Sequence, residues 1–180
     1  MSIHTLGHST RSQDALIALL QEAGVELLVD VRSYPRSRRN PQFDAETLAA
    51  ALGRAGIGYA HLQALGGKRG CQKGDAPSAN TAWREPGFRN YADYALTPAF
   101  QAGLADLRAA ARARPTAIMC AEAAWSRCHR RIIADYLLAA GEEVVHILGP
   151  GASEPASLSP DAVPQPDGTV HYPAKQGSLF

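Results

Sequence analysis

Residues 26–32, Glu-Leu-Leu-Val-Asp-Val-Arg, constrain the fold of this chain more than any other segment. Their apolar centre is typical of a strand in a parallel sheet that is covered on both faces. Similar short apolar segments recur, with helical patterns between them, at residues 3–7, 58–62, 116–120 and 143–148. Repeated strand–helix–strand units with short connections favour right-handed crossovers. The sequence therefore predicts a three-layer α/β fold, in which a mainly parallel sheet of about five strands is flanked by helices in a Rossmann-like or rhodanese-like topology.

The helical patterns are bounded by residues that commonly begin or end helices. A capping side chain, a first-turn proline or a terminating glycine marks each predicted helix. These helices cover residues 12–24, 44–56, 97–114 and 128–140. The segment 66–87 is rich in Gly, Lys, Ser and Pro and is predicted to be irregular.

The composition changes after Gly149. Residues 150–175 contain six prolines, interspersed with Gly, Ser and Asp. A segment of this composition buries little apolar surface, so it is predicted to be flexible or partly extended. We therefore expect an α/β domain over residues 1–149 and a Pro/Gly-rich tail over residues 150–180.

Charge and cysteine content restrict the class of protein. The formal net charge is +1, so attraction to an anion requires local clustering of cations. The three cysteines include no CxxC pair, and no signal peptide is evident at the start, which indicates a reducing compartment. No apolar run approaches the length of a membrane span. We expect a cytoplasmic protein without a membrane partner.

Polar and cationic segments follow four of the predicted strands. They comprise residues 7–11, 30–40, 61–69 and 120–131. The carboxyl ends of parallel strands share one edge of the sheet, where ligands bind. The sequence therefore predicts that these four segments converge on one rim.

The rim is rich in arginine, which favours the recognition of phosphate or another anion. The alternative is a solvated loop whose arginines pair with surface carboxylates. The predicted anion-binding residues are His8, Ser9, Arg32, Arg36, Arg38, Arg39, Arg127 and Arg130. An anionic ligand or a nucleic acid is the expected partner.

Cys120 ends a predicted strand and precedes a loop, an arginine and a helix. This order resembles that of cysteine phosphatases and rhodaneses, in which a helix N-terminus stabilises a thiolate. However, six residues separate Cys120 from Arg127 instead of five, the loop lacks glycine, and Glu122 adds a negative charge. The alternative is that Cys120 is a small core residue.

Glu122 is the stronger candidate for acid–base chemistry, with His129 beside it and Asp30 across the rim. A carboxylate among arginines suits a base or a metal ligand. The alternative is that Glu122 and Asp30 only orient the arginines through salt bridges.

The sequence requires no cofactor, although a divalent metal is compatible with the residue types present. Candidate ligands are His8, Asp30, Cys120, Glu122, Cys128 and His129. Cys128 and His129 are adjacent, and no pair has the spacing of a zinc knuckle. No metal site is therefore predicted.

A set of short motifs lies at residues 5–9, 29–33, 35–37, 40–43, 65–67, 87–92, 120–122 and 128–130. Together these motifs resemble the domain of unknown function family 488 (DUF488), and the resemblance runs from about Ile3 to Gly149. Because the activity of the family is not established, the resemblance supports the fold and the rim positions but implies no reaction.

The last residues, Gln-Gly-Ser-Leu-Phe, resemble the peptide by which bacterial replication and repair proteins bind the sliding clamp. The resemblance assigns partner binding to Gln176, Leu179 and Phe180, although Gly177 replaces a leucine that is common in such peptides. The alternative is that Leu179 and Phe180 fold back onto their own domain.

Three functions remain open from the sequence. The first is a DNA-associated protein, an enzyme acting on a phosphate-bearing or nucleic-acid substrate. The second is a sulfurtransferase or phosphatase that uses Cys120, and the third is a non-catalytic adaptor that binds an anionic partner.

Overall fold

Strands and helices alternate along the chain as the sequence predicts. The computed structural model describes residues 2–72 and 77–174. The strands are β1 (Ser2–Gly7), β2 (Leu27–Asp30), β3 (Gly58–His61), β4 (Thr116–Cys120), β5 (Glu143–Gly149), β6 (Ala152–Pro155), β7 (Val163–Pro164) and β8 (Val170–His171). The α-helices are α1 (Gln13–Glu22), α2 (Ala45–Arg54), α3 (Pro86–Ala95), α4 (Pro98–Ala113) and α5 (Arg130–Ala139). Short 3-10 helices are η1 (Pro41–Phe43), η2 (Gln63–Leu65) and η3 (Trp125–Arg127).

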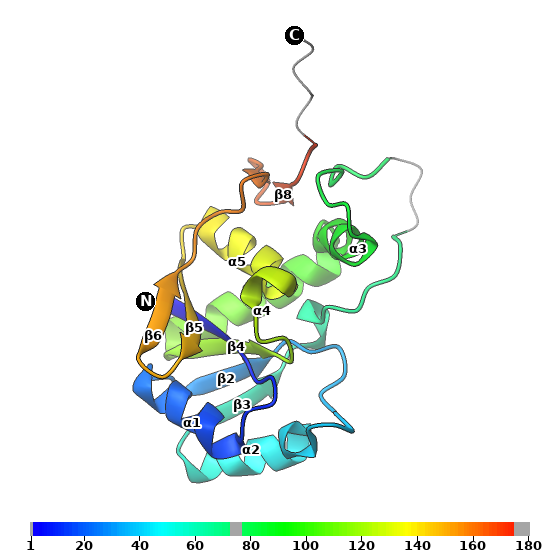
Figure 1. Ribbon diagram of the computed structural model, residues 1–180. Coiled ribbons are helices and arrows are strands. Elements are labelled where there is room, and N and C mark those ends of the chain that lie inside the picture. Colours follow the sequence, from blue (N-terminus) through cyan, green and yellow to red (C-terminus); the bar gives the residue numbers. More distant parts are fainter. Residues whose placement is uncertain (1, 73–76, 175–180) are drawn as a thin grey trace.

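The central sheet has the strand order β3-β2-β4-β1-β5-β6. The pairs among β1 to β5 are parallel, and β6 pairs antiparallel with β5. Helices α1 and α2 cover one face, and α3, α4 and α5 cover the other (Figure 1). The predicted three-layer, mainly parallel α/β fold is confirmed.

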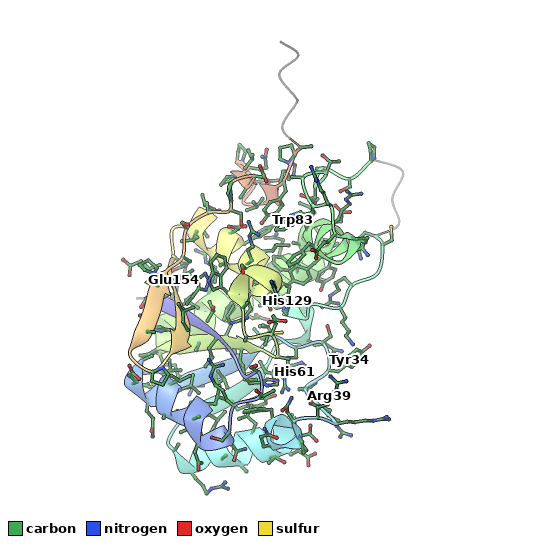
Figure 2. All side chains as sticks on the ribbon, viewed as in Figure 1. Tyr34, Arg39, His61, Trp83, His129 and Glu154 are labelled. Atoms are coloured by element: carbon green, nitrogen blue, oxygen red, sulfur yellow. The ribbon has the colours of Figure 1, made fainter. Side chains whose placement is uncertain are left out.

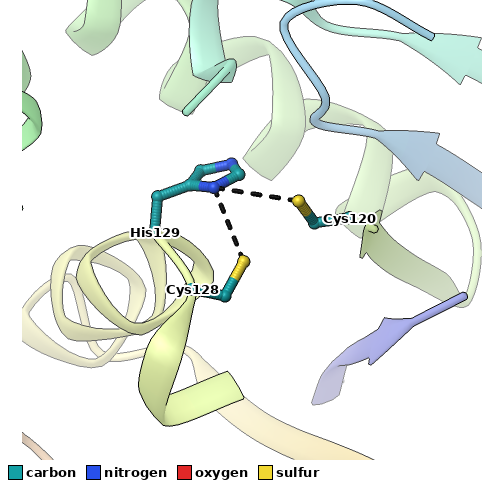
Figure 3. A group of neighbouring side chains, drawn as sticks. All are labelled: Cys120, Cys128 and His129. Carbon is teal, nitrogen blue, oxygen red and sulfur yellow. Dashed lines mark hydrogen bonds between the residues drawn. The ribbon is translucent and has the colours of Figure 1, made fainter. Parts of the chain in front are cut away.

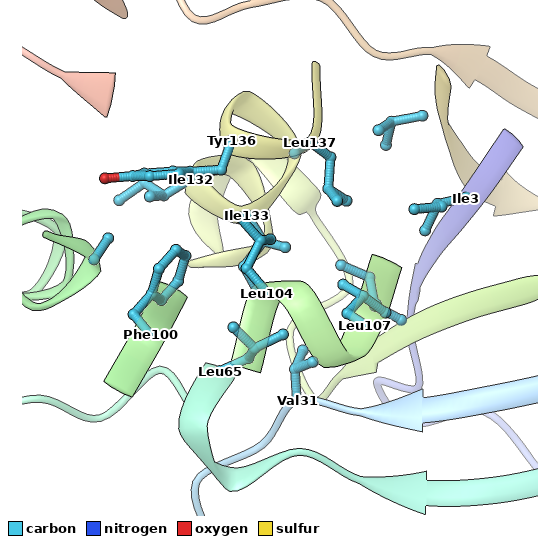
Figure 4. Packing of buried hydrophobic residues seen from close by; sticks show 14 of the residues in the cluster. Ile3, Val31, Leu65, Phe100, Leu104, Leu107, Ile132, Ile133, Tyr136 and Leu137 are labelled. Atoms are coloured by element: carbon cyan, nitrogen blue, oxygen red, sulfur yellow. The ribbon is translucent and has the colours of Figure 1, made fainter. Parts of the chain in front are cut away.

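Alternate residues of the buried strands supply the two cores, because successive side chains of a strand point to opposite faces. On β2, Leu27 and Val29 pack with α4 and α5, whereas Leu28 packs with α1 and α2. In the first core, Leu104 of α4 and Ile133 of α5 pack together over the sheet (Figure 4). This two-sided burial explains the apolar centre that the sequence shows.

Residues 152–172, which the sequence assigns to a flexible or partly extended tail, pack against the domain in several places. Strand β6 extends the sheet, and Tyr172 is fully buried, with its hydroxyl donating to Asp135 Oδ2 at 2.9 Å. The proline-rich composition concealed a few apolar side chains, such as Val170, that pack against α5. Helix α3 was also not predicted. The proposed clamp-binding residues lie outside the described part of the chain.

The strand ends that matter for function lie side by side. Gly7 is in register with Cys120, and Asp30 is in register with both Met119 and His61. The helices after β1 and β2 cover one face and the helix after β4 covers the other. Loops therefore diverge on both sides of β4, which is where open α/β sheets form a ligand-binding crevice.

Candidate functional site

A cavity of about 310 Å³ opens at this edge of the sheet, and we refer to it as the strand-end cavity. All four predicted rim segments contribute to it. Its lining residues are His8, Arg32, Ser33, Tyr34, Arg36, Ser37, Gly67, Lys68, Cys120, Ala121 and His129. Tyr34, Arg39, His61 and His129 lie on the same side of the molecule (Figure 2). Segments far apart in the sequence thus meet at one site.

Arg32 is held rigidly in the cavity wall by Asp30. The guanidinium donates from Nε to Oδ1 at 2.9 Å and from Nη2 to Oδ2 at 2.6 Å, and Nη2 also donates to the Phe43 carbonyl at 2.7 Å. Burial lowers the pKa of Arg32, but the hydrogen bonds and charge of Asp30 outweigh this effect and raise it. Arg32 is therefore a fixed cation in the cavity wall.

Asp30 itself does not line the strand-end cavity. It is fully buried, and its Oδ2 also accepts a hydrogen bond from the Tyr59 hydroxyl at 2.8 Å. Burial, followed by the charge of Asp30, raises the pKa of Tyr59. This placement differs from the predicted acid–base role, because the Asp30 carboxylate is enclosed by its donors. It matches the alternative that Asp30 orients an arginine.

His8 is a neutral part of the same wall. Its Nδ1 donates to the Ser9 carbonyl at 2.8 Å, and its Nε2 accepts from Arg32 Nη1 at 3.4 Å. The ring stacks on Phe43 at 4.3 Å between centroids. Burial is the main cause that lowers the pKa of His8. Ser9, which has a positive φ of 49°, does not line the cavity.

Arg36 and Lys68 supply the accessible cations. Both are exposed, and neither forms an ion pair with a carboxylate in the part of the chain that the structure describes. The Lys68 ammonium lies 5.8 Å from the centroid of the Tyr34 ring. No acidic residue lines the strand-end cavity among the described residues. The cavity therefore has charge of one sign.

Other predicted arginines are placed differently. Arg38 and Arg39 are exposed on the loop after β2 and lie outside the strand-end cavity, and Arg127 lines two other cavities. Arg130 is 1% exposed, and its guanidinium donates to the Glu122 carbonyl at 2.5 Å and to Cys128 Sγ at 3.4 Å. This burial does not favour the predicted role of Arg130 as an anion clamp, because its donors already hold the loop after β4.

Two thiols and an imidazole meet where β4 ends and α5 begins (Figure 3). His129 Nδ1 lies 3.5 Å from Cys128 Sγ and 3.9 Å from Cys120 Sγ. His129 Nε2 lies 2.9 Å from the Val31 carbonyl. Because a carbonyl only accepts, Nε2 carries the proton, and Nδ1 presents its lone pair to the sulfurs in the neutral ring.

Gly67 makes room for this imidazole. A Cβ at position 67 would lie 2.3 Å from His129 Nδ1, so any larger residue would displace the ring. Gly7 has a similar role beneath the loop after β4, since a Cβ there would lie 1.9 Å from the Glu122 carbonyl oxygen. The two glycines explain why the rim segments approach so closely.

The two thiols have different proton affinities. Hydrogen bonding from Cys120 lowers the pKa of Cys128 well below its ordinary value, and His129 and Arg130 add to this effect. The same hydrogen bond, together with burial, raises the pKa of Cys120. The pair therefore favours one negative charge on Cys128, shared through a hydrogen bond.

A second cavity, of about 410 Å³, adjoins the first. It shares Gly67, Cys120, Ala121 and His129 with the strand-end cavity. Glu122 lines this second cavity; it is exposed, and its Oε1 accepts from the Ala124 amide at 3.2 Å. Glu122 and His129 thus border a common space, Cys120 lines both cavities, and Cys128 lines only the second.

Ser33, Tyr34, Ser37 and Lys68 lie in the predicted rim segments, but the sequence analysis gave none of them a specific role in the site. Ser33, Tyr34 and Ser37 follow Arg32 in the same loop, and all three line the cavity. Cys128 was considered only as a metal ligand and then set aside, because it is adjacent to His129 and shows no zinc-knuckle spacing. Its useful signal is the immediately following His129 and Arg130, which together favour a thiolate.

The comparisons with known proteins identify a family. The model of a domain of unknown function, DUF488, matches residues 12–137. This match covers more than half of the chain, which therefore belongs to the DUF488 family. No curated protein and no solved structure matches the chain. In the described residues, no helix is both long and apolar enough to cross a membrane.

Proposed function

We propose that this member of the DUF488 family is an enzyme that binds a phosphate-bearing substrate, a nucleotide or nucleic acid, in the strand-end cavity. The observation that carries the proposal is the set of cations on its wall, Arg32, Arg36 and Lys68, with no carboxylate beside them among the described lining residues. Guanidinium groups and hydroxyls are the donors that phosphate oxygens prefer. A fixed cation and two accessible ones provide both orientation and attraction.

The size of the cavity limits what it holds. About 310 Å³ is at the lower end of the range for small-molecule sites. The cavity suits one phosphate-bearing unit and not a duplex. The exposed Arg38 and Arg39 continue from its wall along the loop after β2. A nucleic acid would therefore place one unit in the cavity and its neighbouring phosphates against these two arginines.

Binding of a nucleoside monophosphate and of a labelled oligonucleotide tests the proposal. Arg36→Ala is expected to weaken nucleotide binding by about tenfold, because it removes one charged phosphate contact. Arg38→Ala with Arg39→Ala is expected to weaken oligonucleotide binding and to lower the slope of log affinity against log salt by about two. Titration calorimetry and fluorescence anisotropy measure these effects.

The matched control removes two cations from the opposite edge of the sheet, Arg54 and Arg112. Arg54 is exposed in the last turn of α2, and the side chain of Arg112 is 69% exposed in the last turn of α4. Arg54→Ala with Arg112→Ala changes the net charge equally but leaves the rim intact. Equal losses in both double variants, or no binding at low salt, would overturn the proposal.

Acid–base work in such an enzyme falls to Glu122 or His129, which border the adjoining cavity. A second candidate function, thiol chemistry at Cys120, is favoured by the position of this sulfur in the cavity wall, 3.9 Å from His129 Nδ1. The raised pKa of Cys120, caused by its hydrogen bond with Cys128 and by burial, disfavours it. If Cys120 reacts with iodoacetamide no faster than the exposed Cys71, this second function is excluded.

Association with replicating or repaired DNA is supported by the C-terminal sequence alone. Gln176, Leu179 and Phe180 resemble a clamp-binding peptide and lie outside the described residues. Surface plasmon resonance against an immobilised sliding clamp tests this part. Binding that is unchanged by Leu179→Ala with Phe180→Ala would remove the clamp from the proposal.

A further inference from the structure

We propose that Cys120, Cys128 and His129 bind a single zinc ion where the two cavities adjoin. The donor atoms come from the end of β4 and the start of α5 and lie within 4.8 Å of one another. Two thiolates and one imidazole are ligands that zinc prefers. The inference concerns metal binding itself, so it does not depend on which substrate occupies the strand-end cavity.

The distances between the donor atoms fit a tetrahedral ion. Ordinary zinc–sulfur and zinc–nitrogen bond lengths place sulfur and nitrogen roughly 3.5 Å apart around one tetrahedral centre. Cys128 Sγ and His129 Nδ1 are separated by 3.5 Å, and Cys120 Sγ and Nδ1 by 3.9 Å. Both sulfur–nitrogen separations are therefore close to those around one tetrahedral ion, and all three donor atoms lie within 4.8 Å of one another.

The surroundings of the three ligands are those of a metal centre. His129 Nε2 donates to the Val31 carbonyl at 2.9 Å, which fixes the ring and directs the Nδ1 lone pair to the sulfurs. Such a hydrogen bond on the far nitrogen is the usual partner of a metal-bound histidine. Gly67 contributes by leaving space beside the ring. The imidazole is thus positioned before any metal arrives.

The charge of Arg130 supports thiolate ligands independently. This guanidinium is 1% exposed, and in the described part of the chain it contacts carbonyl oxygens and Cys128 Sγ but forms no ion pair with a carboxylate. A buried cation without a counter-charge is costly. Zinc-bound thiolates place negative charge on the sulfur that Arg130 contacts.

Three protein ligands leave one tetrahedral position open. Structural zinc sites have four protein ligands, whereas catalytic sites keep one position for water or substrate. Cys120 and His129 line both cavities, so the open position faces solvent-accessible space. If the proposed function also holds, a phosphate oxygen or a water molecule would occupy this position.

The test uses the full chain, stripped of metal under reducing conditions and titrated with Zn²⁺ and with Co²⁺. We expect one zinc per chain, and a cobalt adduct with an intense thiolate-to-cobalt charge-transfer band. Cys120→Ser and Cys128→Ser are each expected to weaken zinc binding by at least about 100-fold, and Gly67→Ala by about tenfold. Cys71→Ser is the matched control, since Cys71 is exposed and lies outside both cavities.

The cobalt spectrum of the unaltered protein keeps the test decisive even if a variant fails to fold. Absence of the thiolate band, or equal zinc affinity in the unaltered protein and in a Cys120→Ser, Cys128→Ser double variant, would overturn the inference. Nucleotide binding by the zinc-free protein is measured separately, so failure of the metal site is distinguishable from failure of the proposed function.

Discussion

The loops after β2 and β4 each bring a buried arginine to the same edge of the sheet, and the two arginines are balanced in different ways. Arg32 is 5% exposed and pairs with the buried carboxylate of Asp30. Arg130 is 1% exposed and contacts carbonyl oxygens and the sulfur of Cys128. The charge of Arg32 is therefore balanced by a carboxylate within the chain, whereas Arg130 contacts sulfur in place of a carboxylate.

The two arginines therefore contribute to the site in different ways. A charge pair that is satisfied inside the chain fixes a wall of the cavity and changes little during a reaction. A cation beside a thiol favours the thiolate, which is a nucleophile or a metal ligand. The proposed metal ligands thus lie on the β4 side, although the β2 loop contains more of the arginines.

The largest expected effect comes from breaking the ion pair between Asp30 and Arg32. Asp30→Asn leaves the Arg32 guanidinium buried without its counter-charge and is expected to lower the free energy of unfolding by about 3–5 kcal/mol. Urea denaturation followed by circular dichroism measures this loss.

Glu142→Gln is the control for this prediction. Its carboxylate pairs with Arg108 at 2.8 Å, but the two side chains are 21% and 30% exposed. Such a pair contributes about 1 kcal/mol or less. Equal losses in the two variants would show that the Asp30–Arg32 pair is not the internal support described above.

A smaller effect is expected beneath the β4 loop, where Trp125 stacks on His146 at 4.3 Å between ring centroids. Burial, followed by the charge of Arg130, lowers the pKa of His146 from 6.5 to about 4. Below about pH 6.5 the unfolded chain takes up a proton at this residue that the folded chain refuses until about pH 4. The stability contribution of His146 is therefore lost as the pH falls through this window.

Replacement of His146 by Gln is expected to remove on the order of 2–3 kcal/mol from the pH dependence of the unfolding free energy between pH 6.5 and 4. The measurement is urea denaturation of both proteins at several pH values. His4 and His8 also have lowered pKa values because of burial, so only the difference between the two proteins isolates His146. Parallel curves across this window would contradict the prediction.

Much of the fold was predictable because apolar runs, caps and glycines are local signals. The five parallel strands and four of the helices follow from them, and strand β4 has the predicted bounds, Thr116–Cys120. Helix α3 was missed because it lies between a Gly- and Pro-rich segment and a strong helix start. Residues near the C-terminus were misjudged because the burial of Tyr172 depends on a distant partner, Asp135.

The site was predictable in its location but not in its internal roles. Parallel strands bring their carboxyl ends together, so Arg32 and Cys120 were expected to share a rim. Whether an arginine faces a ligand or its own chain depends on side-chain direction, which sequence does not encode locally. Arg130 follows the same polar pattern as Arg36, yet it is buried whereas Arg36 is exposed. Likewise, the closeness of Cys120 to Cys128 results from the path of the loop between them.

The smallest expected effect sharpens the contrast between the two arginines. Arg130→Met removes the donors to the Glu122 and Ala123 carbonyls and to Cys128, but it leaves no buried carboxylate behind. Glu122 and Ala123 are exposed, so water can replace part of the lost hydrogen bonding. The free energy of unfolding is expected to fall by about 1–2 kcal/mol.

Arg32→Met is the matched comparison, because it removes the same group from the side that has a carboxylate. It leaves Asp30 buried without its cation, so its expected loss is about 3–5 kcal/mol. Both losses are measured by urea denaturation of the metal-free, reduced protein. A loss for Arg130→Met as large as that for Arg32→Met would mean that removal of Arg130 also leaves a buried negative charge without its partner, and the expected difference between the two arginines would not exist.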